Sequence, residues 1–343
     1  MRDACKKPPL FVVIIHYFLQ NFRLSLFCYM NFNMEAKINQ SIIPMIWFDN
    51  EAEEAAKFYS SAFPHCKILR TTRYVKEGQE IHGRSEGSVM TIDFEIEGYK
   101  ISALNGGPIF KVNPSVSFFV TYEDKEQVKS VWEVLADGAK ILMPFQQYPW
   151  SERYGWLQDK FGVSWQIGQS RREDDANQPV IPAIMFVGEQ CGKAQAAIDL
   201  YTSIFKNSGI SGVLHYGENE LPDKAGTVKY AQFKLNGQMF IAMDSAMEHA
   251  FSFNEAMSFM VLCGTQQEVD YYWEALGKGG DPNAQVCGWL KDRFGLSWQV
   301  VPSIMDEMLQ SGDREKAERV TKAFMKMKKF DIAQLQRAFD GAP

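Results

Sequence analysis

A stretch of thirteen residues occurs twice in this chain, and it constrains the fold more than any other feature. Residues 155–167 and 288–300 are identical at nine positions, among them two tryptophans, an aspartate, a serine and a glutamine. Agreement in one frame over this length indicates a duplicated unit, and repeats decide how all other elements are interpreted. The chain is therefore predicted to contain two copies of one module.

The repeated stretch has the pattern of a β-hairpin. The Asp-Lys-Phe-Gly segment at 159–162 predicts a turn, in which Gly162 is free to adopt a positive φ. In the strand that follows, Ser164 and Gln166 share one face and Trp165 lies on the other. A polar row backed by large apolar residues favours a sheet that lines a cleft, and the alternative is a solvated polar face.

The remaining elements repeat in the same order. Residues 42–48 predict a strand, a helix follows that Asp49 or Asn50 caps, and three strands follow at about 66–74, 88–97 and 99–105. A strand at 115–121, a helix around 128–135 and further strands complete a second β-α-β-β-β motif. We therefore predict a first domain at 38–170, a polar linker at 171–178 and a second domain at 179–303.

The two ends of the chain differ from the repeats. Residues 304–343 predict helices that Asp313 and Asp331 cap and that Gly341 ends. At the other end, the apolar run at 10–19 is too short to span a membrane and is interrupted by polar residues, with no small-residue cleavage site. We expect 1–37 to be a non-native or disordered extension, with Met34 as the natural start.

Composition limits the classes of partner. With 343 residues the chain is long enough for two or more domains, and a net charge of −6 argues against nucleic acid as the main partner. Six scattered cysteines without a C-x-x-C pair fit reduced thiols better than disulfides or a zinc site. We expect a cytoplasmic protein with a small-molecule ligand and no membrane or nucleic-acid partner. The two modules then form an intramolecular pseudo-dimer in a monomer, or the chain forms a homodimer.

Several motifs together resemble one known family. They are the two Ile-Pro strands with their following Tyr-containing helices, the segment 105–108, the segment 150–154 and both Asp-x-Phe-Gly-x-Ser-Trp-Gln runs. From about residue 40 to the end, the chain resembles the PhnB-like branch of the vicinal-oxygen-chelate superfamily, which contains glyoxalases, bleomycin-resistance proteins and extradiol dioxygenases. The legacy label of this branch is 3-demethylubiquinone-9 3-methyltransferase. The resemblance implies an α+β fold of tandem glyoxalase-like domains, each built of paired βαβββ motifs with curled mixed sheets, plus a C-terminal helical tail.

The resemblance also implies where a metal would be bound. Many members hold one divalent ion with His, Gln or Glu from the first and last strands of their motifs. Carried onto this sequence, these positions fall on Pro44, Pro182, near Ser115 and Ala256, and on Gln166 and Gln299. Proline supplies no ligand atom, so no metal and no other cofactor is predicted. A divalent metal remains the alternative, with His82, His215 or His249 reaching the site by a path that the pattern does not show.

The two copies differ in the loop before the repeated stretch. The first copy has an aromatic loop with an arginine at 148–154, whereas the second has a shortened segment at 281–287. The ligand site of the first domain is predicted to consist of Gln166, Ser117, Trp150, Arg153 and Tyr154. A less complete site in the second domain comprises Gln299, Ser258 and Asp244. The alternative is that Trp150 and Tyr154 only cover a sheet edge.

The leading hypothesis is a small-molecule-binding protein of this superfamily that has no catalytic metal. A divalent-metal enzyme of lyase, isomerase or dioxygenase type is the second hypothesis. A methyltransferase is the third, although no G-x-G-x-x-G turn opens a helix in this sequence. The fourth is an interaction protein in which side chains fill both clefts. The sequence predicts neither the ligand nor a nucleophilic triad, and leaves catalysis by a single acid–base group open.

Overall fold

The computed structural model describes residues 40–170 and 178–342. The predicted N-terminal extension and residues 171–177 of the predicted linker lie outside the described residues. None of the helices in the described part combines the length and apolarity that crossing a bilayer requires.

Three of the four motifs follow the predicted β-α-β-β-β order, and the last motif of the second repeat has one strand fewer. The first repeat comprises β1 (Ile42–Phe48), α2 (Ala52–Ala62), β2 (Cys66–Arg73), α3 (Gln79–His82), β3 (Val89–Ile96), β4 (Tyr99–Asn105), β5 (Val116–Tyr122), α4 (Lys125–Leu135), β6 (Lys140–Tyr148), β7 (Ser151–Gln158) and β8 (Ser164–Gln169). The second comprises β9 (Val180–Val187), η2 (Gly188–Gln190), α5 (Ala194–Ile204), β10 (Gly209–His215), β11 (Val228–Leu235), β12 (Gln238–Ser245), β13 (Met257–Cys263), α6 (Gln266–Gly277), η3 (Pro282–Ala284), β14 (Trp289–Lys291) and β15 (Ser297–Pro302). A short 3-10 helix, η3, thus stands where the first repeat has strand β6.

Each of the two sheets combines one motif from each repeat. Sheet A has the strand order β14-β15-β13-β1-β4-β3-β2, and sheet B has the order β10-β11-β12-β9-β5-β8-β7-β6. The repeats are joined where β1 pairs antiparallel with β13 and β9 pairs antiparallel with β5. This pairing covers the edge that each motif would otherwise expose. The segments 38–170 and 179–303 therefore do not each enclose a cleft of their own, because each sheet is shared between them.

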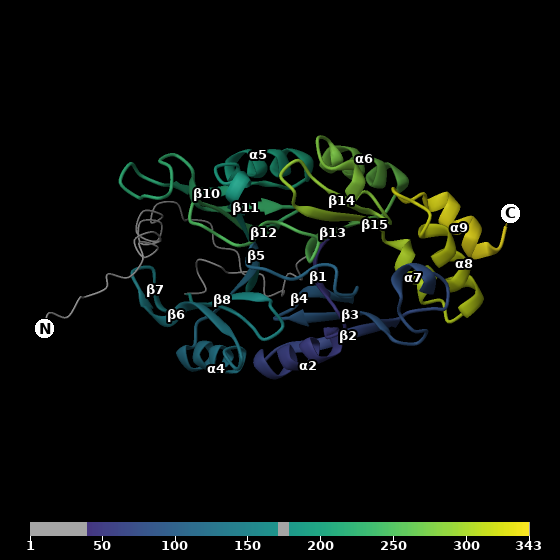
Figure 1. Cartoon of the computed structure of the whole chain (residues 1–343), viewed down its shortest axis with the longest axis horizontal. Helices are drawn as coiled ribbons and strands as arrows, with labels where there is room; N and C mark the ends of the chain where they lie inside the picture. The colour runs from purple at the N-terminus through teal and green to yellow at the C-terminus, as the bar shows by residue number, and fades with distance from the viewer. Residues whose placement is uncertain (1–39, 171–177, 343) are drawn as a thin grey trace, which may run out of the picture.

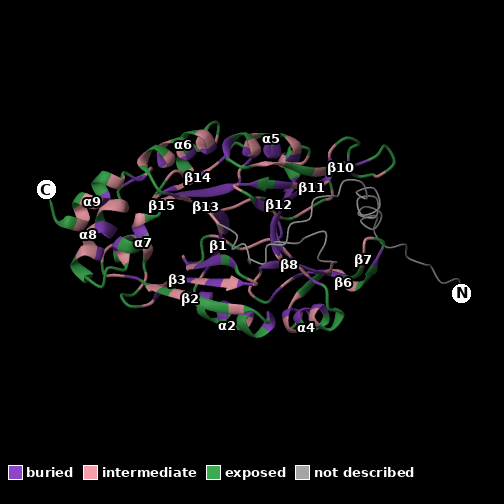
Figure 2. Ribbon diagram, turned by 180° about the vertical axis from the view of Figure 1, so that it is seen from behind, coloured by how far each residue is buried: buried purple, intermediate pink, exposed green. Residues whose placement is uncertain are grey.

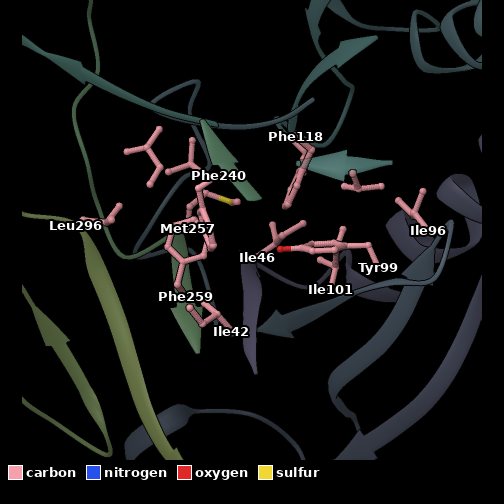
Figure 3. Packing of buried hydrophobic residues seen from close by; sticks show 14 of the residues in the cluster. Ile42, Ile46, Ile96, Tyr99, Ile101, Phe118, Phe240, Met257, Phe259 and Leu296 are labelled. Carbon is pink, nitrogen blue, oxygen red and sulfur yellow. The ribbon is translucent and has the colours of Figure 1, made fainter. Parts of the chain in front are cut away.

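The main hydrophobic core lies on the helix-bearing side of both sheets. Figures 1 and 2 show α2 and α4 on one side of the molecule and α5 and α6 on the other, with exposed residues on their outer surfaces. Residues of both repeats meet in this core, as Figure 3 shows for Ile42, Phe118, Phe240 and Phe259. The rings of Phe240 and Phe259 lie 5.5 Å apart in an edge-to-face contact across the two sheets. We call the opposite face of each sheet its inner face.

A buried aspartate explains much of the repeated stretch. Asp159 Oδ1 accepts hydrogen bonds at 2.9 Å from the amides of Phe161 and Val163, which shapes the turn. Its Oδ2 accepts from the Tyr59 hydroxyl of α2 and the Trp165 indole, both at 2.9 Å. Asp292 repeats this set with Phe294, Leu296, Tyr201 and Trp298. The aspartate and the second tryptophan of the repeated stretch therefore stabilise the turn and its packing on the helix. Gly162 has a positive φ, as predicted, with a value of 87°.

The helix ends partly follow the sequence. Asp313 and Asp331 cap their helices, and Gly341 has a φ of 73°, as predicted. The predicted cap of α2 by Asp49 or Asn50 is wrong. Glu51 occupies the N-cap position but its side chain makes no capping bond to the helix, and Asn105 Oδ1, at the end of β4, accepts from the Ala52 amide at 2.9 Å instead.

The C-terminal tail lies at one end of the molecule, beside sheet A (Figure 1). It consists of α7 (Ile304–Leu309), α8 (Arg314–Phe324) and α9 (Ile332–Asp340). The amides of Cys287 and Gly288 donate to the carbonyls of Met327 and Lys328, at 2.9 and 2.8 Å. On the other edge of the sheet, Arg70 of β2 pairs with Asp306 of α7 at 2.8 Å. The tail thus connects both edges of sheet A.

Candidate functional site

The inner face of sheet B carries a chain of hydrogen-bonded side chains. Gln166 of β8 donates through Nε2 to Ser117 Oγ of β5 at 2.8 Å, and accepts through Oε1 from the Tyr154 hydroxyl of β7 at 2.7 Å. All three side chains are buried, with at most 6% of their surface exposed. The amide of Gln166 keeps one N–H and one lone pair beyond these two bonds. The structure therefore brings together three of the five residues that were predicted for the first domain.

Aromatic rings surround this hydrogen-bonded chain. Trp150 stacks on Tyr148 with ring centroids 4.9 Å apart and lies edge-on to Tyr154 at 5.9 Å. Among the described residues, no partner accepts a hydrogen bond from the buried Nε1 of Trp150. The indole of Trp156, by contrast, donates to Ser164 Oγ at 2.7 Å. Trp150 is therefore the fourth predicted residue at this site, and it holds an unused donor.

The second repeat contributes part of the same face. On β11, Gln232 Nε2 donates to the Tyr230 hydroxyl at 2.9 Å. Burial raises the pKa of Tyr154, and the nearby phenols of Tyr148 and Tyr230 raise it further. Met185 of β9 packs in one apolar cluster with Tyr154 and Trp156. The sequence analysis missed Tyr230, Gln232 and Met185, because their contacts depend on the pairing of β5 with β9 and only their strand alternation was visible.

Arg153, the fifth predicted residue, is not part of this cluster. It alternates with Tyr154 along β7 and therefore points to the same side as Gly155. A Cβ on Gly155 would meet Trp132 of α4 at 2.5 Å, which identifies that side as the helix-bearing one. Arg153 is exposed there. Arg153 and Gln166 therefore lie on opposite faces of sheet B.

The residues predicted for the second domain lie on two different sheets. Gln299 Nε2 donates to Ser258 Oγ at 2.9 Å on the inner face of sheet A. Asp244 lies on β12 in sheet B, where its carboxylate accepts from the amides of Gly192, Ala194 and Val228. Burial raises the pKa of Asp244, and these amides lower it again in part. Asp244 thus holds the start of α5 in place, as Asn105 does for α2.

The first strands of the two inner faces lack the ligands that a divalent metal of the superfamily type would need. Pro44 pairs with Phe259 and Pro182 with Phe118, and both phenylalanines belong to the core. The prolines therefore point away from the inner faces, so these two first-strand positions are one residue out of register, whereas Gln166 and Gln299 face inward. The first-strand residues that do face inward are Ile43, Met45 and Trp47 in sheet A, and Ile181, Ala183 and Met185 in sheet B. None of these supplies a carboxylate or an imidazole.

The three candidate histidines also lie apart from one another. His82 ends α3 and packs on Tyr74 at 4.4 Å, and His215 ends β10. His249 bonds through Nε2 to Ser245 Oγ at 2.8 Å, at the end of β12, and burial lowers its pKa. Within the ranges 40–170 and 178–342, no three His, Cys, Asp or Glu side chains are grouped so that they could hold a metal ion.

Comparison with known structures gives relatives of one repeat and of both repeats. A putative 3-demethylubiquinone-9 3-methyltransferase, PhnB protein, from Bacillus cereus is 35% identical, with a TM-score of 0.35, over 38% of this chain and 100% of its own. A protein from Staphylococcus aureus is 30% identical, with a TM-score of 0.16, over 38% of this chain and 97% of its own. Glyoxalase I from Zea mays is 13% identical, with a TM-score of 0.48, over 76% of this chain and 92% of its own.

The sequence comparisons place both repeats in one family. No curated protein matches the sequence significantly. The sequence model of the 3-demethylubiquinone-9 3-methyltransferase family matches twice, over residues 40–168 and 178–301. The chain therefore belongs to the 3-demethylubiquinone-9 3-methyltransferase family and carries its domain in two tandem copies.

Proposed function

We propose that this protein binds a small molecule on the inner face of sheet B and does so without a catalytic metal. The observation that carries the proposal is the buried Trp150 Nε1–H, which lacks an acceptor among the described residues. Leaving a buried donor unpaired costs about 1–3 kcal/mol. A ligand with a hydrogen-bond acceptor would recover this energy. A face that served packing alone would gain no stability from an unpaired indole N–H.

The surroundings favour an uncharged, planar ligand that carries a carbonyl group. The rings of Tyr148, Trp150 and Tyr154 offer edges and faces for an aromatic or quinonoid ring. The free N–H of the Gln166 amide is a second donor for a carbonyl oxygen. The family name refers to a demethylubiquinone, whose ring has this planar shape and these oxygen substituents.

A superfamily lyase, isomerase or dioxygenase that uses a divalent metal would need several convergent carboxylate or imidazole ligands, and no three such side chains are grouped within the described residues. The lack of such a group of metal ligands therefore favours ligand binding over metal-assisted chemistry. Near-stoichiometric metal in protein purified without chelators would favour the enzyme instead. Tight binding of S-adenosylmethionine in a calorimetric titration would favour the methyltransferase.

Duroquinone is a suitable probe, because its ring is planar, carries two carbonyls and is fully substituted against thiol addition. It is expected to raise the melting temperature, since a ligand of the native state stabilises it by mass action. Trp150→Phe keeps an aromatic ring and removes the N–H, and should weaken binding about tenfold in calorimetry. Gln166→Leu should weaken it similarly.

Arg153→Ala provides the matched control. This side chain belongs to the same strand as Tyr154 but lies on the opposite face, so binding should remain as in the unmodified protein. The proposal fails if duroquinone binds equally well to Trp150→Phe and Gln166→Leu, or if Arg153→Ala weakens binding as much as they do.

A further inference from the structure

The inner face of sheet A is the counterpart of the proposed site, and the two faces differ in which polar groups are paired. Duplication places Ser258 where sheet B has Ser117 and Gln299 where it has Gln166. The hydrogen bond between serine and glutamine is present on both faces, at 2.9 and 2.8 Å. The faces diverge in the groups around this pair.

In sheet B, neighbouring residues donate hydrogen bonds to the polar side chains of the repeated stretch. Tyr154 donates to the glutamine Oε1, and Trp156 donates to Ser164. In sheet A, Cys287 stands where sheet B has Tyr154, and its thiol is directed to the carbonyl of Phe324 in the tail, at 3.7 Å. In the described part of the chain, no donor reaches Oε1 of Gln299.

The counterpart of Ser164 in sheet A is also unpaired. Ser297 is only 1% exposed, and its hydroxyl has no hydrogen-bond partner within the described ranges. It lies on the inner face, because it neighbours Ser258 in the parallel pair of β13 and β15. Sheet A thus holds a buried hydroxyl group and an amide oxygen that are both free to bind a ligand.

A large aromatic residue, Trp47, lies beside Trp289, the counterpart of Trp156 in sheet A. Trp47 occupies the place of Met185, and Trp289 lies edge-on to it with centroids 6.0 Å apart. Trp47 is itself fixed, because its indole donates to the Gly107 carbonyl at 2.7 Å and Phe110 packs on it at 5.1 Å. The three rings form an aromatic corner beside the unpaired polar groups.

The tail covers one end of the same face. Val301 of β15 and Cys287 pack against its buried cluster, which includes Met305 and Met308 of α7. The ion pair of Arg70 with Asp306 holds α7 to the far edge of the sheet. The unpaired polar groups, Ser297 Oγ and Gln299 Oε1, therefore lie between the tail at one end of the face and the aromatic corner at the other.

We propose that the inner face of sheet A is a second binding site, which takes an uncharged aromatic molecule through an O–H or N–H donor. The donor of the ligand would bond to Gln299 Oε1, and Ser297 would donate to or accept from the adjacent polar atom of the ligand. The aromatic corner would pack against its ring. This site therefore selects for hydrogen-bond donors, whereas the site proposed on sheet B selects for acceptors, and neither depends on the other.

The test uses the full chain and 4-hydroxybenzamide, which combines a flat ring with O–H and N–H donors. Indole ¹H–¹⁵N resonances report its position, because Trp47 and Trp289 line sheet A while Trp150 and Trp156 line sheet B. The probe should shift the signals of Trp47 and Trp289. Ser297→Ala should weaken its binding about tenfold, and Gln299→Leu should have the same effect.

Ser164→Ala is the matched control, since it removes the corresponding hydroxyl from sheet B. It should leave the binding of 4-hydroxybenzamide unchanged but lower the melting temperature, because Trp156 loses its acceptor. Ser297→Ala should not lower the melting temperature, because it breaks no hydrogen bond. The proposal is overturned if the Trp47 and Trp289 signals do not respond to millimolar probe, if Ser297→Ala and Gln299→Leu leave its binding unchanged, or if Ser297→Ala destabilises the protein as Ser164→Ala does.

Discussion

At the scale of single residues, the identities within the repeated stretch have two different causes. Asp159 and Trp165 are fixed by the fold, since the carboxylate ties the turn to α2 and to the indole. Gln166 and Ser164 lie on the inner face, where Gln166 donates to Ser117 and Ser164 accepts from Trp156. Alternation along the strand predicted the face of Gln166, but no local pattern shows that Asp159, seven residues upstream, is buried and accepts four hydrogen bonds.

Asp159→Asn is expected to lower the free energy of unfolding by about 1–3 kcal/mol. The amide NH₂ that replaces Oδ2 would face two donors, and the Trp165 indole cannot become an acceptor. Chemical denaturation monitored by circular dichroism measures the change. Asp292→Asn should cost a similar amount, whereas Asp137→Asn, at an exposed position, should have almost no effect. An unchanged midpoint for Asp159→Asn would contradict this role.

At the scale of elements, the alternation of side chains along a strand decides which of the predicted site residues lie together on an inner face. Tyr154 and Arg153 are neighbours in sequence, yet only Tyr154 reaches the inner face, and the same rule moves Pro44 and Pro182 out of the metal positions. Side chains alternate between the two faces of a strand, so the face of every residue follows once the face of one residue is known. The tail helices could be predicted from their caps, but their docking could not, because it rests on contacts between segments distant in sequence.

Gly288→Ala is expected to loosen the tail from sheet A. Gly288 has a φ of 80°, and a Cβ there would lie 2.3 Å from the ring of Phe330. Hydrogen exchange measured by mass spectrometry should therefore rise across α8 and α9. Gly295→Ala has nearly the same φ, 85°, but no atom within 4 Å of its Cβ, so it introduces backbone strain without the clash. Equal exchange in the tail of both variants would show that Gly288 does not control the docking.

At the scale of the whole molecule, the duplication and the order of elements could be predicted, because both are local and periodic. The assembly of the two copies could not. The pairing of β1 with β13 joins strands that are more than 200 residues apart, and the short Ile-Pro strands give no local signal for that partner. Tyr230 and Gln232 were missed for the same reason.

A single cut between the repeats is expected to leave the molecule assembled. If a protease site is placed within residues 171–177 and cleaved, β1–β13 and β5–β9 still hold the two fragments together. Size-exclusion chromatography of the nicked protein should give one peak at the position of the intact chain. A cut between α7 and α8, which severs no connection between the two sheets, serves as the comparison. Two separate fragment peaks after the first cut would contradict the shared sheets.

The exchange of strands between the repeats has a consequence for how such a protein diverges. In a symmetric pair of single-copy chains, every substitution appears twice and alters two identical surfaces together. Here each sheet combines one motif from each copy, so the difference between Trp47 in sheet A and Met185 in sheet B alters one inner face alone. The duplication thereby allows the two inner faces of one polypeptide to diverge independently while both sheets remain part of a single folded body.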